Sequence, residues 1–235
     1  MNFENTEVWG FKHAIRGMRN PMNSWSKSDS GECDGQCAEC RYVDKNCDTD
    51  DYIGANDIKL AQQLIRAGSE HRKFLRQIFV SVDIVAPLYW WKEFDTYKIG
   101  TTANSTSTMH KLTSQPITME CFEMDDYDKE LFIAGLYRTR NMWERIIMDM
   151  EFLRKKYVET KDKRYWKELI RALPESWLQT RTVTMNYENL YSIIRQRHNH
   201  KLTEWSESFI NWCKTLQYAD ELLFLDLDKK EGEQS

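Results

Sequence analysis

The clearest alternation of apolar and polar positions lies inside the segment from residue 71 to 110. Apolar residues occupy every second position from Ile78 to Ile84, which is the period of a β-strand that buries one face. Pro87 follows, and it cannot donate a hydrogen bond to a strand ladder. The pattern therefore predicts a central strand that ends at Pro87, followed by a short aromatic helix over residues 88–95.

Residues 98–110 predict a polar loop. Nine of these thirteen residues are Gly, Ala, Ser, Thr or Asn, so the loop offers many hydrogen-bonding groups and close access to its backbone. Beside Lys98, Lys111 and several aromatic residues, such a loop is a candidate cradle for a nucleotide. An ordinary surface turn with Ser and Thr chosen for solubility is the alternative.

Helical periodicity is found on both sides of this segment. Asn56 or Asp57 is a good N-cap for a helix that Gly68 would end. Residues 70–77 predict a further helical turn or two. Apolar residues then recur at three- and four-residue steps from about residue 125 to 159, which indicates a long helix with one face on a core. Helices are also expected over residues 163–172 and 202–225.

Composition limits the classes of protein that the chain can belong to. At 235 residues and 41% hydrophobic content, it can form one substantial core, so we expect a single domain over residues 1–225 and an acidic tail over 226–235. The net charge of −4 argues against a general nucleic-acid-binding protein. No run of eighteen apolar residues suggests a membrane helix. The first ten residues lack the pattern of a signal peptide, which favours a cytoplasmic protein.

A Gly-, Asp- and Cys-rich insert covers residues 31–50. Its cysteines have the spacing C-x3-C-x2-C-x6-C, and in a reducing compartment such clustering indicates metal more often than disulfides. Four thiolates would complete a tetrahedral structural zinc site. Free thiols on a loop and an iron–sulfur cluster are the alternatives. The candidate ligands are Cys33, Cys37, Cys40 and Cys47.

The central segment resembles the signature region of the flavin-dependent thymidylate synthases. His71 falls at the opening His of that family, and Ala86-Pro87 at its Ala-Pro, with no gap between them. The stretch Asn104-Ser105-Thr106-Ser107 matches the family's N-E-x-S. Later in the chain, the family's L-P, Asn, Leu and final Arg correspond to Leu173-Pro174, Asn186, Leu190 and Arg197, with residues 180–185 as the intervening strand.

The resemblance implies an α/β (α+β) fold, with a mixed sheet flanked by long helices, and a homotetramer with shared active sites. It also implies FAD as cofactor, dUMP or a related pyrimidine nucleotide as substrate, and methylenetetrahydrofolate and NADPH as partners. No protein nucleophile is needed, because the cofactor carries the reaction. The expected cofactor-binding residues are His71, Lys98, Asn104, Asn186 and Arg197. The expected substrate-binding residues are Ser105, Ser107 and Arg195.

The departures from the family fall on its arginines. Thr96-Tyr97-Lys98 replaces Arg-His-Arg, Met109-His110 replaces Arg-Tyr, and Glu188 replaces an Arg. Arg and Lys are not equivalent at a bidentate phosphate site, and Glu188 reverses a charge. Two functions therefore remain open: a synthase-like methyltransferase, or a catalytically degenerate nucleotide-binding protein of the same fold. A purely structural oligomer is the third hypothesis.

Two arginines near the N-terminus, Arg16 and Arg19, flank Gly17. They could contact a phosphate from a flexible turn. Alternatively, they are solvated surface residues, as most arginines are.

Overall fold

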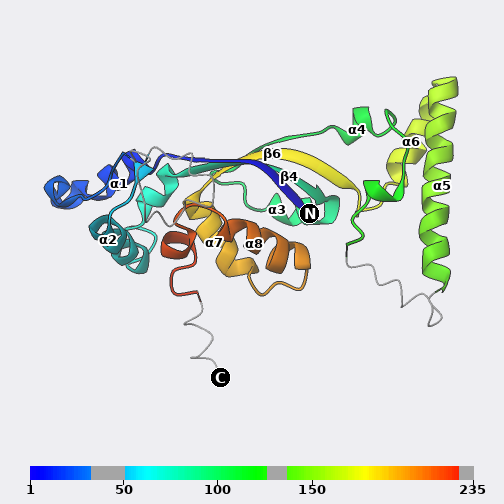
Figure 1. Cartoon of the computed structure of the whole chain (residues 1–235). Helices are drawn as coiled ribbons and strands as arrows, with labels where there is room; N and C mark the ends of the chain where they lie inside the picture. The colour runs from blue at the N-terminus through cyan, green and yellow to red at the C-terminus, as the bar shows by residue number, and fades with distance from the viewer. Residues whose placement is uncertain (33–50, 126–136, 228–235) are drawn as a thin grey trace. The chain divides into compact units, whose positions relative to one another are not determined.

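The computed structural model describes residues 1–32, 51–125 and 137–227 (Figure 1). These residues form two compact units whose segments alternate along the chain. The first unit contains residues 1–4, 83–97 and 103–182. The second contains residues 5–82, 98–102 and 183–235.

The main sheet is antiparallel, with the strand order β1-β4-β6-β5. Its strands are β1 (Asn2–Trp9), β4 (Phe79–Pro87), β5 (Thr102–Ser105) and β6 (Leu178–Asn186). A small hairpin pairs β2 (Gly31–Glu32) with β3 (Asp51–Tyr52). With helices between and after the strands, the predicted α/β fold class is confirmed.

The central strand predicted from the alternation is β4. Ile78, Val80, Val82, Ile84 and Ala86 have no exposed surface, while the residues between them are half-buried. Pro87 ends the strand, and the aromatic helix α3 (Leu88–Phe94) follows it as predicted. Burial of one face at period two therefore determines the register of this strand.

The polar segment 98–110 is more ordered than the predicted loop. It contains the edge strand β5 and the short helix α4 (Thr108–Lys111). The backbone N–H of Thr106, just after β5, donates to Thr180 O at 2.9 Å. The prediction of a loop was wrong here because an exposed edge strand carries no apolar alternation, whereas Thr suits a strand by its β-branched shape.

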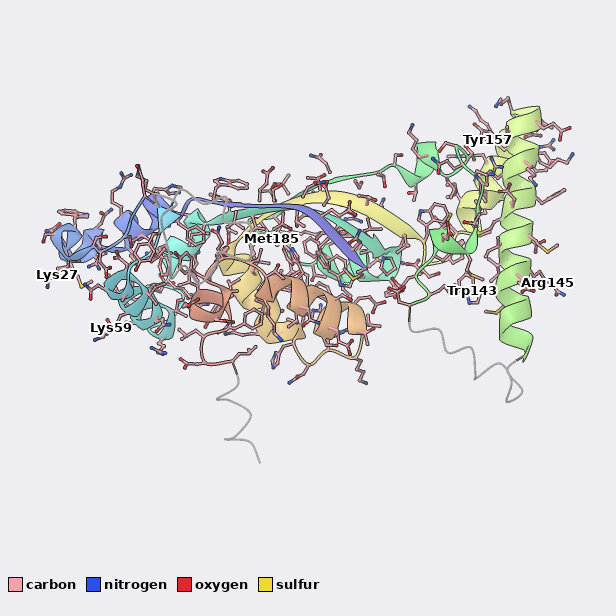
Figure 2. All side chains as sticks on the ribbon, in the orientation of Figure 1. Lys27, Lys59, Trp143, Arg145, Tyr157 and Met185 are labelled. Carbon is pink, nitrogen blue, oxygen red and sulfur yellow. The ribbon has the colours of Figure 1, made fainter. Side chains whose placement is uncertain are left out.

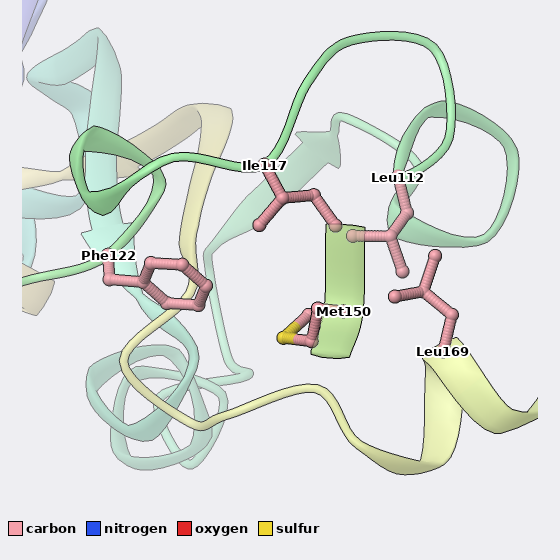
Figure 3. Packing of buried hydrophobic residues seen from close by; sticks show 5 residues of the cluster. All are labelled: Leu112, Ile117, Phe122, Met150 and Leu169. Carbon is pink, nitrogen blue, oxygen red and sulfur yellow. The ribbon is translucent and has the colours of Figure 1, made fainter. Parts of the chain in front are cut away.

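The first unit has its own hydrophobic core beside helices α5 (Tyr137–Thr160) and α6 (Lys163–Arg171). The side chains of Leu112, Ile117, Met150 and Leu169 converge there, with Phe122 beside them (Figure 3). Trp143 packs against this cluster, and Arg145 points away from it (Figure 2). The long helix predicted from three- and four-residue spacing and the helix expected over residues 163–172 are thus confirmed, with residues 126–136 outside the described part.

The second unit is built from helices packed around buried aromatic and aliphatic side chains. Its helices are α1 (Phe11–Met18), α2 (Ala55–Arg66), α7 (Tyr187–Arg197) and α8 (Ile210–Lys214). Short 3-10 turns lie at Asn20–Met22, Trp25–Lys27 and Lys73–Gln77, with another at Met119–Cys121 in the first unit. π-helical turns occupy Glu204–Phe209 and Ala219–Leu223.

Two boundaries in this unit differ from the prediction. The N-cap of α2 is Gly54, and the side chain of Asp29 accepts the N–H groups of Asn56 and Asp57 at 2.9 and 3.1 Å. The single closing helix expected over 202–225 is interrupted at Tyr218, whose φ of 53° lies in the left-handed region. In the described part of the chain, no helix is long and apolar enough to span a bilayer.

Candidate functional site

The junction of β6 and α7 is the best-formed feature among the predicted site residues. Asn186 is the N-cap of α7, and its side chain accepts the N–H of Asn189 at 3.0 Å. The Asn189 side chain in turn accepts the N–H of Asn186 at 3.2 Å, which completes a capping box. Because this reciprocal pair fixes the first turn of the helix, the position of Asn186 is set by the backbone around it.

The loop that carries Lys98 lies directly against this helix start. Asn189 Nδ2 donates to the carbonyl of Ile99 at 2.6 Å. Gly100 has φ +78°, and a Cβ there would lie 2.9 Å from Asn189 Oδ1 and 3.0 Å from Asn186 Nδ2. Only glycine fits this approach. The structure thus brings the exposed Lys98 loop and the buried residues Asn186 and Tyr187 at the start of α7 into one place.

Glu188, the residue that reverses the charge of the family's Arg, is not an isolated carboxylate. Arg72 Nε lies 2.9 and 3.1 Å from its two oxygens. Both side chains are mostly buried, with 17% and 15% of their surface exposed. Arg72 follows the exposed His71 and also stacks 4.4 Å from the ring centre of Tyr191. An arginine from another segment therefore neutralises the substituted position.

Arg195, expected to bind substrate, is engaged by the protein itself. Its guanidinium donates to the carbonyls of Leu223 and Leu225, both at 2.8 Å, and lies 3.3 Å from the ring centre of Tyr191. Burial lowers the pKa of Arg195, and the nearby Arg72 acts in the same direction, while Tyr191 opposes the shift. These contacts tie the end of the described chain to α7. A substrate-binding role for Arg195 stays a prediction.

Arg197, the last residue of α7, stacks on Trp205 with its guanidinium carbon 4.9 Å from the ring centre. Trp205 is fully buried. The side chain of Arg197 is thus half-buried at the opposite end of α7 from Asn186. Because Arg197 lies eleven positions after Asn186, about 16 Å along the helix axis, these two expected cofactor-binding residues do not form one cluster within this helix.

Three predicted residues belong to the other unit. Asn104 and Ser105 are exposed on the edge strand β5, and Ser107 is half-buried after it. The backbone oxygen of Ser107 accepts the N–H of Lys111 at the start of α4. Gln179 fixes this segment by donating to the carbonyl of Thr106 at 2.9 Å. These contacts order the edge of the sheet at β5 and the residues just after it, which carry the hydroxyl groups of Ser105 and Ser107.

The predicted zinc ligands Cys33, Cys37, Cys40 and Cys47 lie outside the described residues. Within residues 1–32, 51–125 and 137–227, no group of three or more His, Cys, Asp or Glu side chains is placed to hold a metal. The zinc site therefore stays a prediction.

A buried carboxylate that the sequence analysis did not identify organises the N-terminal half of the second unit. Asp57 is fully buried, and its oxygens accept from Arg19 Nε at 2.5 Å, Ser28 Oγ at 2.7 Å and Ser30 Oγ at 2.6 Å. Burial alone would raise the pKa of Asp57, but the hydrogen bonds from Ser30, Ser28 and Arg19 and the charge of Arg19 together hold it below its ordinary value.

Both interpretations of Arg19 were wrong. Its side chain is 5% exposed and paired with Asp57, so it is neither a solvated surface residue nor a flexible phosphate contact. The sequence did contain a signal. Asp57 shares the buried helical stripe of Ala61 and Ile65 at i+4 and i+8, and a carboxylate on such a stripe requires a buried partner. Arg16, by contrast, is exposed.

Comparison with known proteins identifies the fold. No protein-family model and no curated protein matches the sequence. Two solved structures of flavin-dependent thymidylate synthase ThyX from Helicobacter pylori, each with FAD and dUMP, superimpose with TM-scores of 0.64 and 0.65. Each is 16% identical in sequence, and each alignment covers 97% of this chain and 99% of the other. The resemblance seen in the sequence is therefore confirmed in three dimensions: the chain has the fold of the flavin-dependent thymidylate synthases.

Proposed function

We propose that this protein binds FAD and a pyrimidine nucleotide, dUMP or a close variant, and transfers a one-carbon unit to the base as a thymidylate synthase-like methyltransferase. The observation that carries this proposal is the junction of the Gly100 loop with the N-terminus of α7. Two asparagine side chains and a glycine approach within van der Waals contact there, on a fold whose solved examples hold FAD and dUMP.

The residues at this junction suit a phosphorylated, planar cofactor. The dipole of the eleven-residue helix α7 favours an anion at its N-terminal end, and the exposed Lys98 lies on the loop that contacts this end. His71 is exposed two sequence positions before the 3-10 turn at Lys73. We assign FAD binding to His71, Lys98, Asn104, Asn186 and Arg197. When bound, FAD would supply the redox chemistry, and the protein would bind and orient the reactants.

We assign the nucleotide to Ser105, Ser107 and Arg195, with Ser hydroxyls as hydrogen-bonding groups for a base or phosphate. A folate as one-carbon donor, NADPH as reductant, a cytoplasmic location and a homotetramer with shared sites complete the proposal. They rest on the resemblance described above. The missing arginines of the family mean that this chain would hold a phosphate with fewer bidentate contacts.

A specific observation favours the second candidate, a nucleotide-binding protein without the methyl-transfer reaction. Arg72 and Glu188 neutralise each other at 2.9 Å, and Arg195 is engaged by two backbone carbonyls. Two of the cations that could neutralise a substrate phosphate are thus already occupied by the protein. Catalysis depends on groups aimed at the charge that develops in the transition state, and binding alone does not need them.

One set of measurements separates the two candidates. Protein purified without added cofactor is examined for flavin absorbance and then titrated with FAD and dUMP. Release of the proton at position five of dUMP is measured in the presence of methylenetetrahydrofolate and NADPH. Flavin binding with proton release supports the methyltransferase, and flavin or nucleotide binding without it supports the degenerate protein. If neither ligand binds at millimolar concentration, both candidates are excluded.

A matched pair of variants locates the site. Lys98→Ala removes the exposed cation beside Gly100 and is expected to weaken FAD binding about tenfold, since one charge-assisted contact is lost. Lys59→Ala removes another exposed lysine, from α2 (Figure 2), and should leave binding unchanged. Equal affinities for the two variants would place the flavin elsewhere.

A further inference from the structure

A cavity lies in the second unit, formed by α1 and the turns that follow it. Its volume is about 240 Å³. Phe11, Ile15 and Ile53 are buried apolar residues that line it. Trp25 and Tyr52 also line it, although about half of each side chain is exposed. Large aromatic side chains that remain exposed beside an apolar floor provide surfaces on which a flat ligand can stack.

Hydrogen bonds fix the walls of this cavity. Trp25 Nε1 donates to Asn20 Oδ1 at 2.9 Å, which holds the indole in place. Asp57 holds Arg19, Ser28 and Ser30 through the hydrogen bonds described above, and all three residues line the cavity. The cavity is therefore built on a buried carboxylate and does not depend on flexible side chains at its base.

The cavity wall is cationic. Lys12, Arg16 and Arg19 line it, and none of the lining residues in the described ranges is Asp or Glu. Arg19 is neutralised by Asp57, and Lys12 pairs with Glu32 at 2.5 Å on the exposed surface. The guanidinium of Arg16 has no hydrogen-bond or ion-pair partner within the described parts of the chain and is one helical turn from Lys12. Arg16 is therefore the group best placed to receive an anion.

We propose that this cavity binds a compact aromatic anion: one ring or two fused rings that carry a phosphate or a carboxylate. The ring would lie on the apolar floor between Trp25 and Tyr52, and the anion would meet Arg16. Its volume is below the range of about 300–1,000 Å³ usual for drug-sized ligands, so a dinucleotide such as FAD is too large. This site shares no residue with the Gly100–α7 junction and does not depend on the proposed function.

The test uses naphthyl phosphate, with calorimetric titration of the full-length protein. Naphthol presents the same rings without charge, and inorganic phosphate presents the charge without rings. We expect naphthyl phosphate to bind with submillimolar affinity, and each half-ligand at least tenfold more weakly. Naphthoate, titrated in parallel, shows whether the cavity prefers a carboxylate or a phosphate. If naphthyl phosphate or naphthoate binds more tightly than naphthol, the result supports the site.

Variants assign the binding to the cavity. Arg16→Gln and Trp25→Leu should each weaken binding of naphthyl phosphate about tenfold. Lys27→Gln is the matched control, because Lys27 is exposed in the same turn but does not line the cavity (Figure 2). The substituted side chains are exposed, and unchanged melting temperatures would confirm the folded state of each variant.

Three results would overturn the proposal: no binding at millimolar concentration, equal affinity for naphthol, or a loss of affinity in Lys98→Ala instead of Arg16→Gln. The last result would place the probe at the Gly100–α7 junction. A protein that binds FAD but not naphthyl phosphate would leave the proposed function standing without this second site. A protein that binds naphthyl phosphate but not FAD would support this cavity and contradict the proposed flavin site.

Discussion

Two arginine–carboxylate pairs in the second unit differ in what surrounds them. Arg19 and Asp57 are 5% and 0% exposed, and hydroxyl and backbone donors complete the shell around the carboxylate. Arg72 and Glu188 are 17% and 15% exposed, and an aromatic ring lies beside the guanidinium. The Arg19–Asp57 pair thus holds a set of turns together, whereas the Arg72–Glu188 pair neutralises a candidate ligand site.

The difference lies in desolvation. A buried ion pair is costly to form and even more costly to break, because removal of one partner leaves the other charge without water or a counter-ion. The Arg72–Glu188 pair keeps some contact with water, so its loss costs less stability than the loss of a fully buried pair. We therefore expect changes at Asp57 to have the larger effect on folding, and changes at Glu188 to have a smaller effect on stability together with an effect on ligand affinity.

Asp57→Asn should produce the largest effect. The amide keeps the size of the side chain but leaves the Arg19 guanidinium buried without a counter-ion and replaces one acceptor oxygen by a donor. We expect a loss of about 3–5 kcal/mol in the free energy of unfolding, measured by urea denaturation. Asp149→Asn, the same change at an exposed residue of α5, is the control. A loss no greater than that of the control would mean that the pair does not organise these turns.

The pKa of Asp57 predicts how this stability depends on pH. Because its folded-state pKa is depressed, the contribution of Asp57 is complete above the unfolded value of about 3.9 and is lost as the pH falls through the depressed value. The wild type should therefore lose stability on acidification below about pH 4 more steeply than Asp57→Asn. Parallel stability–pH curves for the two proteins would contradict this assignment.

The sequence predicted well those elements whose buried residues recur at the regular spacing of a strand or a helix. β4 and α3 were found because Ile78 to Ile84 alternate and Pro87 ends the strand. The helix α5 was found because its apolar residues recur at helical spacing. The edge strands β1 and β5 were not predicted, since most of their residues are exposed and carry no such pattern.

The candidate site was predictable only in part. The N-cap at Asn186 follows from local rules, since Asn before a helix satisfies backbone donors. The partners of Arg19, Arg72 and Arg195 come from 38, 116 and 28–30 residues away in sequence, and no local rule pairs them. Sequence therefore indicated where charges lie but not which of them the protein itself neutralises.

Swapping the two charges of the Arg72–Glu188 pair tests how strongly these side chains interact. Glu188→Arg alone places two guanidinium groups together and should cost about 1–2 kcal/mol of stability, an effect between those of exposed and buried pairs. Arg72→Glu with Glu188→Arg restores the pair in reverse and should recover most of that loss. Urea denaturation of both single variants and the double variant measures the coupling. Additive effects would show that the two charges do not interact.

The same exchange also tests the ligand site. With Arg at position 188, the double variant carries the residue type that the family resemblance expects there, while the pair stays neutral overall. If position 188 faces the nucleotide, the affinity for dUMP should rise about tenfold, whereas that of Arg72→Lys should change little. An unchanged affinity in the double variant would mean that this pair lies away from the nucleotide.

The smallest effect is expected at a pair that is exposed on both sides. Lys92 and Glu175 in the first unit are 2.6 Å apart, but 68% and 53% of their side chains are exposed. Water and salt screen such a pair, and holding two long side chains together costs conformational entropy. Lys92→Gln should therefore leave the urea midpoint within experimental error at any salt concentration. A distance of 2.6 Å is as short as many contacts of Asp57, so a measurable loss here would show that proximity, and not burial, determines the strength of these pairs.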